Sequence, residues 1–359
     1  MPIQLPREQE YIQALFQLTL SPTDPKKVVQ LIAGLNTRER EEFLSLADSN
    51  HVIIRSLRTV LAATDVPEET KLWAARSIAI EDERIAHALR YLATICNTLE
   101  ANDCPVTVMK TLDHWPDLGN DLDLYSTASP ELIVKVIAER FNARMEPRSW
   151  GDRLANKWNF SVPGLPESVE VHVQRLGQVG EHVALARRFL NRRVSQTIGG
   201  VAFRVPAPEE RIIVATLQRM YRHFYFRICD IANSAAIVES AGLNFDELRS
   251  ASESSGIWPG VATYLLIVSD FLKRYRGRGL EMPPMVSESA AFGGEKVTAR
   301  ARFLRIPMLP EGASLYSRQI TQAAFSGDVP ATLRLSLLPS LATAAALAYR
   351  LTGSDKGVW

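Results

Sequence analysis

The sequence predicts an α+β fold in which a small mixed β-sheet lies between helical regions at both ends of the chain. From Glu8 to about Glu100, and again from Pro208 onward, apolar residues recur at three- and four-residue intervals, as in amphipathic helices. From Cys104 the pattern changes to alternation of apolar and polar residues, which indicates strands. We expect four parts, namely a helical N-terminal region (1–100), an α/β core (101–206), a helical domain (207–280) and a loop-rich segment with C-terminal helices (281–359).

The N-terminal region is expected to form five helices separated by proline or by Asn/Asp punctuation, because proline removes a backbone donor that a helix interior needs. These helices are Tyr11–Leu20, Lys26–Leu35, Glu39–Ala47, Val52–Ala63 and Glu69–Leu99. No cluster of histidine, cysteine or carboxylate side chains in this region suggests a site, so we interpret it as a scaffold.

The α/β core is expected to contain five strands and one helix. The expected strands are a segment ending near Lys110, then Asp121–Tyr125, Arg144–Trp150, Lys157–Val162 and Ser168–Gln174, with a helix from Pro130 to Asn142. In the last strand Val169, Val171 and Val173 form the buried row, because successive strand residues face opposite sides.

Pro208 begins the next helical run, which continues to about Ser240. Proline loses no needed donor in a first helical turn, and the carboxylates of Glu209 and Glu210 favour the positive helix end. Further helices are expected at Phe245–Ser252, Gly260–Arg276, Arg318–Phe325 and in the apolar run from Leu335 to Tyr349. The segment Glu281–Gly312 is rich in proline and glycine and is expected to be a loop or linker.

Composition is that of an ordinary soluble globular protein, with 46% hydrophobic and 23% charged residues. Lys and Arg number 41 against 40 Asp and Glu, so the net charge does not indicate a nucleic-acid partner. The 3 cysteines are too few and too scattered for a disulfide framework or a structural zinc site, which favours a reducing cytoplasm. The N-terminus has no secretory signal pattern, so we expect the chain to be mature as written, and no apolar run is long enough to suggest a membrane partner.

Asp121 and Asp123 are the strongest candidate metal ligands. Other acidic pairs spaced by one residue occur in helical settings, where the two side chains point about 200° apart. On a strand they share a face, so both carboxylates stand opposite the buried Leu122 and Leu124. Two carboxylates this close repel each other unless a cation holds them.

Glu170 is the third candidate ligand, because it lies with His172 on the face opposite the valines of its strand. If that strand lies beside the Asp121 strand, three carboxylates meet, which suits Mg²⁺ or Mn²⁺. A pair of such ions supports nucleotidyl transfer by activating a hydroxyl and stabilising the leaving pyrophosphate. We expect His172 to be a hydrogen-bond partner rather than a ligand or base.

These motifs resemble the nucleotidyltransferases of the polymerase-beta superfamily, especially the bacterial group described as uncharacterised nucleotidyltransferases. The similar stretches are Val106–Leu112, Asp117–Tyr125, Val169–His172, Pro206–Glu210, Tyr221–His223 and Arg227–Asp230. The resemblance implies a nucleotidyltransferase core in which Asp121, Asp123 and Glu170 are catalytic and bind the metal. It also implies a nucleoside triphosphate donor and an acceptor that can be a small molecule, a protein or RNA.

One departure concerns phosphate binding. The superfamily has glycine followed by serine or glycine after the first strand, whereas this chain has Thr111 and Leu112 after Lys110. Thr111 can offer a hydroxyl and an amide, and Lys110 can add positive charge. The residues that we expect to contact the nucleotide are Lys110, Thr111, Gly119, Asn120, Arg222 and Arg227.

Two alternatives stay open beside a metal-dependent nucleotidyltransferase. A glycosyltransferase also uses an Asp-x-Asp pair but would have a doubly wound nucleotide-binding half before it, where this chain is helical. A catalytically degenerate binding or regulatory protein, antitoxin-like, would explain the missing phosphate-binding step. Two basic pairs, at 187–188 and 192–193, are interpreted as a solvated face or a weak RNA contact. Arg227 and Asp230 are expected to form an ordinary surface or interdomain ion pair. The oligomeric state is not predicted.

Overall fold

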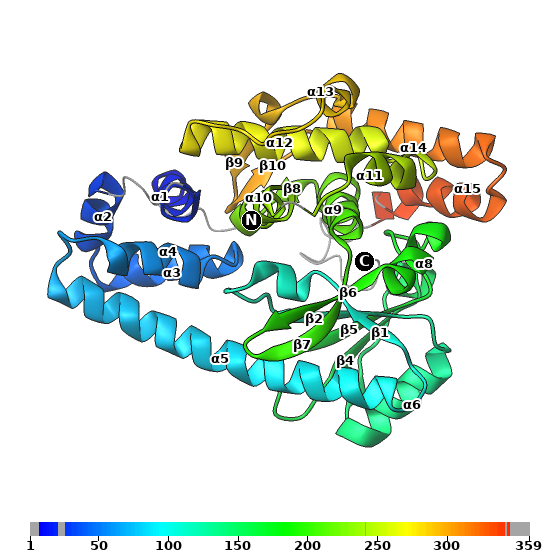
Figure 1. Ribbon diagram of the computed structural model, residues 1–359, viewed down its shortest axis with the longest axis horizontal. Coiled ribbons are helices and arrows are strands. Elements are labelled where there is room, and N and C mark those ends of the chain that lie inside the picture. The colour runs from blue at the N-terminus through cyan, green and yellow to red at the C-terminus, as the bar shows by residue number, and fades with distance from the viewer. Residues whose placement is uncertain (1–6, 21–25, 241, 342, 345–359) are drawn as a thin grey trace.

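The computed structural model describes residues 7–20, 26–240, 242–341 and 343–344 and confirms the α+β class. Helices from both ends of the chain lie around a small mixed sheet (Figure 1). Among the helices of the described residues, none combines the length and the apolar character that a bilayer crossing requires.

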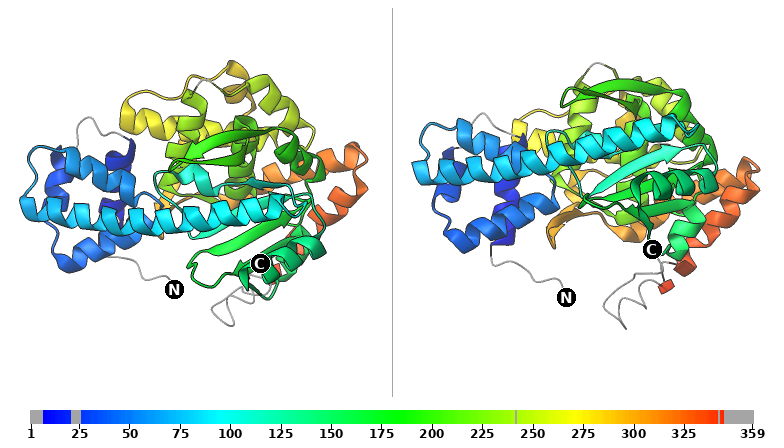
Figure 2. Two further views of the ribbon diagram at one scale, coloured as in Figure 1. Left: turned by 60° about the horizontal axis from the view of Figure 1, so that its bottom comes forward. Right: turned by 90° about the horizontal axis from the view of Figure 1, so that it is seen from below.

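The N-terminal region folds as five helices, close to the predicted ranges. They are α1 (Glu8–Leu20), α2 (Lys26–Ala33), α3 (Thr37–Ser49), α4 (Ile53–Ala62) and α5 (Glu68–Glu100). Helix α3 begins with a capping box, in which Asn36 and Glu39 each accept a hydrogen bond from the other's backbone amide. Figure 2 shows α5, which is 33 residues long, running from the other N-terminal helices along the sheet.

The central sheet has the strand order β1-β2-β5-β4-β3. Its strands are β1 (Val106–Val108), β2 (Asp121–Ser126), β3 (Arg144–Met145), β4 (Lys157–Ser161) and β5 (Ser168–Val173), with α6 (Pro130–Phe141) after β2. The central pair β2 and β5 is parallel, whereas the other neighbouring strands are antiparallel. This order confirms that the Glu170 strand lies beside the Asp121 strand.

The strand predicted at Arg144–Trp150 is much shorter than expected. After β3 the chain turns, and α7 (Trp150–Ala155) begins. The side chain of Ser149 accepts a hydrogen bond from the Asp152 amide, and Asp152 accepts one from the Ser149 amide. This capping box stabilises the start of α7. The predicted strand, Arg144–Trp150, extends into this helix start.

Between β5 and the C-terminal helices lie two features that the sequence analysis did not predict. Helix α8 (Val183–Asn191) is followed by the hairpin β6 (Arg193–Ile198) and β7 (Val201–Pro206). The hairpin turn is Gly199-Gly200, with φ values of 55° and 80°. Positive φ at both central residues is typical of a two-residue hairpin turn, so the Gly-Gly pair was a usable signal.

The run predicted as one helix from Pro208 to about Ser240 is divided. Helix α9 (Pro208–Thr216) continues into a π-helical turn at Leu217–His223, and then a short strand, β8 (Tyr225–Phe226), precedes α10 (Ile228–Glu239). Phe224 has φ 54°, in the left-handed region that ends helices. The remaining helices are α11 (Phe245–Glu253), α12 (Trp258–Arg276), α13 (Pro284–Ser289), α14 (Ala313–Phe325) and α15 (Val329–Ser336).

The segment predicted as a loop at Glu281–Gly312 contains regular structure. Besides α13, it forms β9 (Thr298–Arg300) and β10 (Phe303–Arg305), and β10 pairs with β8 in a sheet of order β8-β10-β9. The Phe303 ring stacks on Tyr225 with centroids 4.4 Å apart. Strands of two or three residues carry too little alternation to be recognised in a sequence.

The hydrophobic cores show how the helical regions are joined to each other and to the sheet. Helices α1–α4 share one continuous core with α9–α12, although the two groups are far apart in sequence. The second half of α5 packs with α6 and the central sheet in a second core. A third, smaller core includes Met109, Tyr125 and Phe189. The domain divisions at residues 100, 206 and 280 remain predictions. The helix predicted from Leu335 to Tyr349 lies partly outside the described residues, which include its first part.

Candidate functional site

The parallel pairing of β2 and β5 brings the candidate carboxylates together. Asp123 is directly opposite Glu170 in the register of the two strands. Leu122 and Leu124 are fully buried on the other face, as predicted. Asp121 precedes them on the same strand face as Asp123 and lines the same cavity.

Two lysines already neutralise Asp123 and Glu170. Lys110 Nζ lies 2.6 Å from Asp123 Oδ1 and 3.8 Å from Glu170 Oε1. Lys157, from β4, lies 2.9 Å from Glu170 Oε2 and 3.0 Å from Asp152 Oδ1. Burial alone would raise the pKa of Glu170, but Lys110, His172 and Lys157 together hold this pKa well below its ordinary value. Glu170 is therefore an ionised carboxylate.

Asp121 has a different environment, because it forms no ion pair with a lysine of the described residues. Loss of solvation raises its pKa to about 6, and repulsion from Asp123 and Glu170 adds to the effect. Its side chain is still accessible at the cavity surface. A cation bound between these groups would remove that repulsion.

One group of possible metal-binding atoms comes from Asp123, Glu170 and His172, whose donor atoms lie within 4.8 Å of one another. Asp121 does not belong to this group. His172 Nε2 lies 2.7 Å from Glu170 Oε1, which makes it a hydrogen-bond donor to that carboxylate. Metal-binding histidines usually donate their other ring N–H to a partner, whereas His172 Nδ1 is buried without one among the described residues. The donor set thus fits a cation held by carboxylates, with His172 orienting Glu170.

Thr111 does not turn its donors toward the cavity. Its hydroxyl donates to Asp121 O at 3.2 Å and accepts from the Asp123 amide at 2.8 Å. Its amide donates to Met109 O across a tight turn at Lys110, whose φ is 54°. Thr111 therefore fixes the backbone that carries the carboxylates, and the expected hydroxyl and amide contacts to phosphate are not available.

One cavity of about 180 Å³ contains the predicted site. All nine predicted residues line it, namely Lys110, Thr111, Gly119, Asn120, Asp121, Asp123, Glu170, Arg222 and Arg227. The sequence analysis missed the other lining residues, which are His51, His114, Gln218, Arg219, His223 and Tyr225. The missed residues come mainly from outside the sheet, so no strand alternation marked them.

Arg219 is the largest fully buried side chain of the cavity wall, with 1% of its surface exposed. Its Nε lies 2.7 Å from Asp230 Oδ2. The predicted surface or interdomain ion pair between the Arg227 and Asp230 side chains is therefore wrong. Asp230 pairs with Arg219 and also accepts a hydrogen bond from the Arg227 backbone amide at 2.6 Å. Arg219 lies in the π-helical turn Leu217–His223, which the sequence analysis did not predict.

The basic pairs near α8 are largely occupied inside the protein. Arg188 Nη2 lies 2.7 Å from Glu210 Oε1, and Arg192 Nη2 lies 2.7 Å from Glu209 Oε2. Phe189 between them is fully buried. These contacts tie α8 to the first turn of α9.

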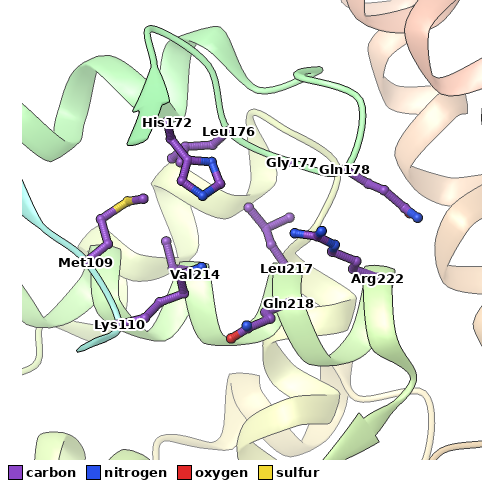
Figure 3. Close-up of a pocket in the computed structure, with 10 residues that line it drawn as sticks. All are labelled: Met109, Lys110, His172, Leu176, Gly177, Gln178, Val214, Leu217, Gln218 and Arg222. Atoms are coloured by element: carbon purple, nitrogen blue, oxygen red, sulfur yellow. The ribbon is translucent and has the colours of Figure 1, made fainter. Parts of the chain in front are cut away.

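A smaller pocket of about 40 Å³ adjoins the cavity and shares Lys110, Gln218 and Arg222 with it. Figure 3 shows the His172 ring pointing into this pocket, opposite Leu217 and Arg222 of the π-helical turn. The pocket therefore extends the cavity next to His172.

Comparison with known proteins gives little further information. No family model and no curated protein matches this chain. Among solved structures, the chain is similar to an antigenic nucleotidyltransferase-like protein from Paracoccidioides brasiliensis, with 16% identity over 47% of this chain and 86% of that one. The TM-score is 0.32, so the likeness carries no argument about function.

Proposed function

We propose that this protein is a divalent-metal-dependent nucleotidyltransferase, which moves a nucleoside monophosphate from a nucleoside triphosphate to an acceptor group. The observation that carries the proposal is the composition of one cavity. Asp121, Asp123 and Glu170 line it from β2 and β5, and Arg222 and Arg227 line it from the segment between α9 and α10. Carboxylates beside guanidinium groups suit a metal–polyphosphate ligand, because each charge of the ligand meets its opposite.

Asp121, Asp123 and Glu170 would hold Mg²⁺ or Mn²⁺. When bound, such ions lower the pKa of an attacking hydroxyl and offset the charge of the leaving pyrophosphate. Lys110 lies 2.6 Å from Asp123, so it would have to release this carboxylate. Its charge would then be free for the triphosphate.

Transfer of label from each radiolabelled triphosphate, in the presence of Mg²⁺ and cell extract, tests the proposal. The wild-type chain is compared with the double variant Asp121→Ala/Asp123→Ala. We expect label in an acceptor only with the wild-type chain. Equal transfer by the variant would remove the metal site from the mechanism, and no transfer with any triphosphate would contradict the enzyme proposal.

A binding protein without catalysis is the second candidate, and two contacts favour it. Lys110 and Lys157 already neutralise Asp123 and Glu170, and Thr111 has no free donor for phosphate. Such a protein would bind triphosphate equally well with Mg²⁺ and with EDTA. The enzyme would bind it more tightly with Mg²⁺, which calorimetry distinguishes.

We also propose that the protein acts in the cytoplasm. Its cysteines, Cys96, Cys104 and Cys229, are all free, as expected for a reducing compartment. Fractionation of cells that produce the chain, with detection by antibody, tests this location.

A further inference from the structure

We propose that His114 is a phosphate-binding residue, held as a neutral N–H donor by a relay from Arg55 through Asn233, in a metal-independent anion subsite with Arg219 and Arg227. The inference rests on the proposed function for the identity of the ligand, a polyphosphate. It assigns the recognition of phosphate to the helical side of the cavity, since the turn after β1 has no free donor from Thr111.

The relay fixes the tautomer of His114. Arg55 Nη1 donates to Asn233 Oδ1 at 2.7 Å, so the other amide atom of Asn233 must be its NH₂ group. That group lies 2.9 Å from His114 Nδ1, which must therefore accept the hydrogen bond. In a neutral imidazole the proton then lies on Nε2. His114 Nε2 has no hydrogen-bond partner within the described part of the chain, and the residue lines the cavity.

A second hydrogen bond, to His51, orients the guanidinium of Arg227. Its Nη1 lies 2.7 Å from His51 Nε2, and because arginine only donates, the His51 nitrogen accepts. The rings of His51 and His114 lie 5.1 Å apart between centroids. His51 thus fixes one arm of Arg227 beside His114 and leaves the rest of the guanidinium for a ligand.

Both histidines are neutral. Burial lowers the pKa of His51 well below its ordinary value, and Arg227 lowers it further. Burial likewise lowers the pKa of His114, with His51 and Arg219 adding to the effect. A neutral His114 beside two arginines avoids a third buried positive charge while it still offers a donor.

The buried guanidinium of Arg219 is a separate observation that supports an anion-binding subsite beside His114. Although 1% exposed, it has no hydrogen-bond partner for Nη1 among the described residues. A buried donor without a partner is costly, and a ligand oxygen would satisfy it. The donors of this wall that have no acceptor in the described residues suit phosphate oxygens. At neutral pH these oxygens accept hydrogen bonds, and only a terminal phosphate can still carry one proton.

Calorimetry with sodium tripolyphosphate in EDTA tests the subsite on the full chain, alongside ¹⁵N spectra of its histidines. We expect tripolyphosphate to bind the wild-type chain and the ¹⁵N spectrum to place the His114 proton on Nε2. His114→Phe should weaken binding about tenfold, as for loss of a hydrogen bond to a charged group. His114→Gln, which keeps an N–H donor, should recover most of the affinity.

Two further variants separate the relay from general damage. Asn233→Leu should weaken binding and allow the other His114 tautomer to appear. His87→Phe removes a histidine of α5 that contacts Gly164 outside the cavity, and it should leave binding unchanged. Circular dichroism shows whether each variant folds.

A His114 proton on Nδ1, full affinity in folded His114→Phe, or no tripolyphosphate binding to the wild-type chain would each overturn the inference. If the proposed function is wrong but the subsite is right, tripolyphosphate binding will depend on His114 and no nucleotidyl transfer will be detected. Transfer that is unaffected by His114→Phe would instead support the function and reject the subsite.

Discussion

The two walls of the cavity are built in different ways. The acidic wall comes from two neighbouring strands, so backbone pairing places Asp123 opposite Glu170. The other wall, which we call the basic wall, combines residues from separate parts of the chain, among them His51, Arg219 and Arg227. Strand pairing positions side chains through local geometry, whereas the basic wall exists only because the N-terminal helices share a core with the C-terminal ones. The walls should therefore respond differently to substitution.

The largest expected effect is on catalysis at the acidic wall. Asp123→Asn should lower nucleotidyl transfer about 1,000-fold, because metal stabilisation of transition-state charge is worth several kcal/mol. Single-turnover kinetics with saturating triphosphate measures this effect. Asp82→Asn, on the surface of α5, is the control and should transfer at the wild-type rate. A similar loss in both variants would mean that the carboxylate of Asp123 has no special role.

Substitutions in the basic wall should lower the free energy of unfolding more than substitutions on the surface. Asp230→Asn leaves Arg219 buried without its counter-charge, which should cost about 3–5 kcal/mol in the free energy of unfolding. Urea denaturation measures it. The control Glu253→Gln breaks the exposed pair with Arg249 and should cost less than about 0.5 kcal/mol. If both variants lose the same free energy of unfolding, the pair between Arg219 and Asp230 matters no more for stability than an exposed ion pair.

Lys110 distinguishes a metal site from a permanent ion pair. Because its ammonium lies 2.6 Å from Asp123 Oδ1, it competes with a metal for that carboxylate. Lys110→Met should raise the affinity for Mn²⁺ about tenfold in the absence of nucleotide, for a pair interaction of about 1.4 kcal/mol. Electron paramagnetic resonance of free Mn²⁺ measures this affinity. Lys110→Arg keeps the charge and should not raise it, and weaker Mn²⁺ binding by Lys110→Met would contradict the competition.

The smallest effect concerns pH and Asp121. Its pKa is raised to about 6, so the folded state binds the proton more tightly than the unfolded state, whose carboxyl has a pKa of about 3.9. Stability of the metal-free protein is therefore lost as the pH rises from about 4 to about 6. Asp121→Asn should stabilise it above pH 6 by about 1 kcal/mol, since the accessible side chain is partly screened. Urea denaturation in EDTA at pH 4 and pH 8 measures the difference, and a benefit of equal size at both would contradict the assignment.

The acidic wall could be predicted from sequence because its information is local. A strand has a side-chain period of two, so Asp121 and Asp123 had to share a face once Leu122 and Leu124 were buried. The same alternation placed Glu170 opposite its valines. Only the pairing of the two strands was left for the structure to decide, and it confirmed the expected adjacency.

Local sequence also determined most helix positions, because apolar periodicity and capping residues act within a few turns. Tertiary structure decided the rest. In the folded protein the Thr111 hydroxyl accepts a hydrogen bond from the Asp123 amide of β2. Arg219 is buried against Asp230, and His51 lies beside Arg227. These outcomes depend on contacts between residues more than a hundred positions apart, as for His51 and Arg227, or on the burial that such contacts create. A pattern along the sequence does not contain that information, because partners for a buried polar group are chosen by the packing of whole elements.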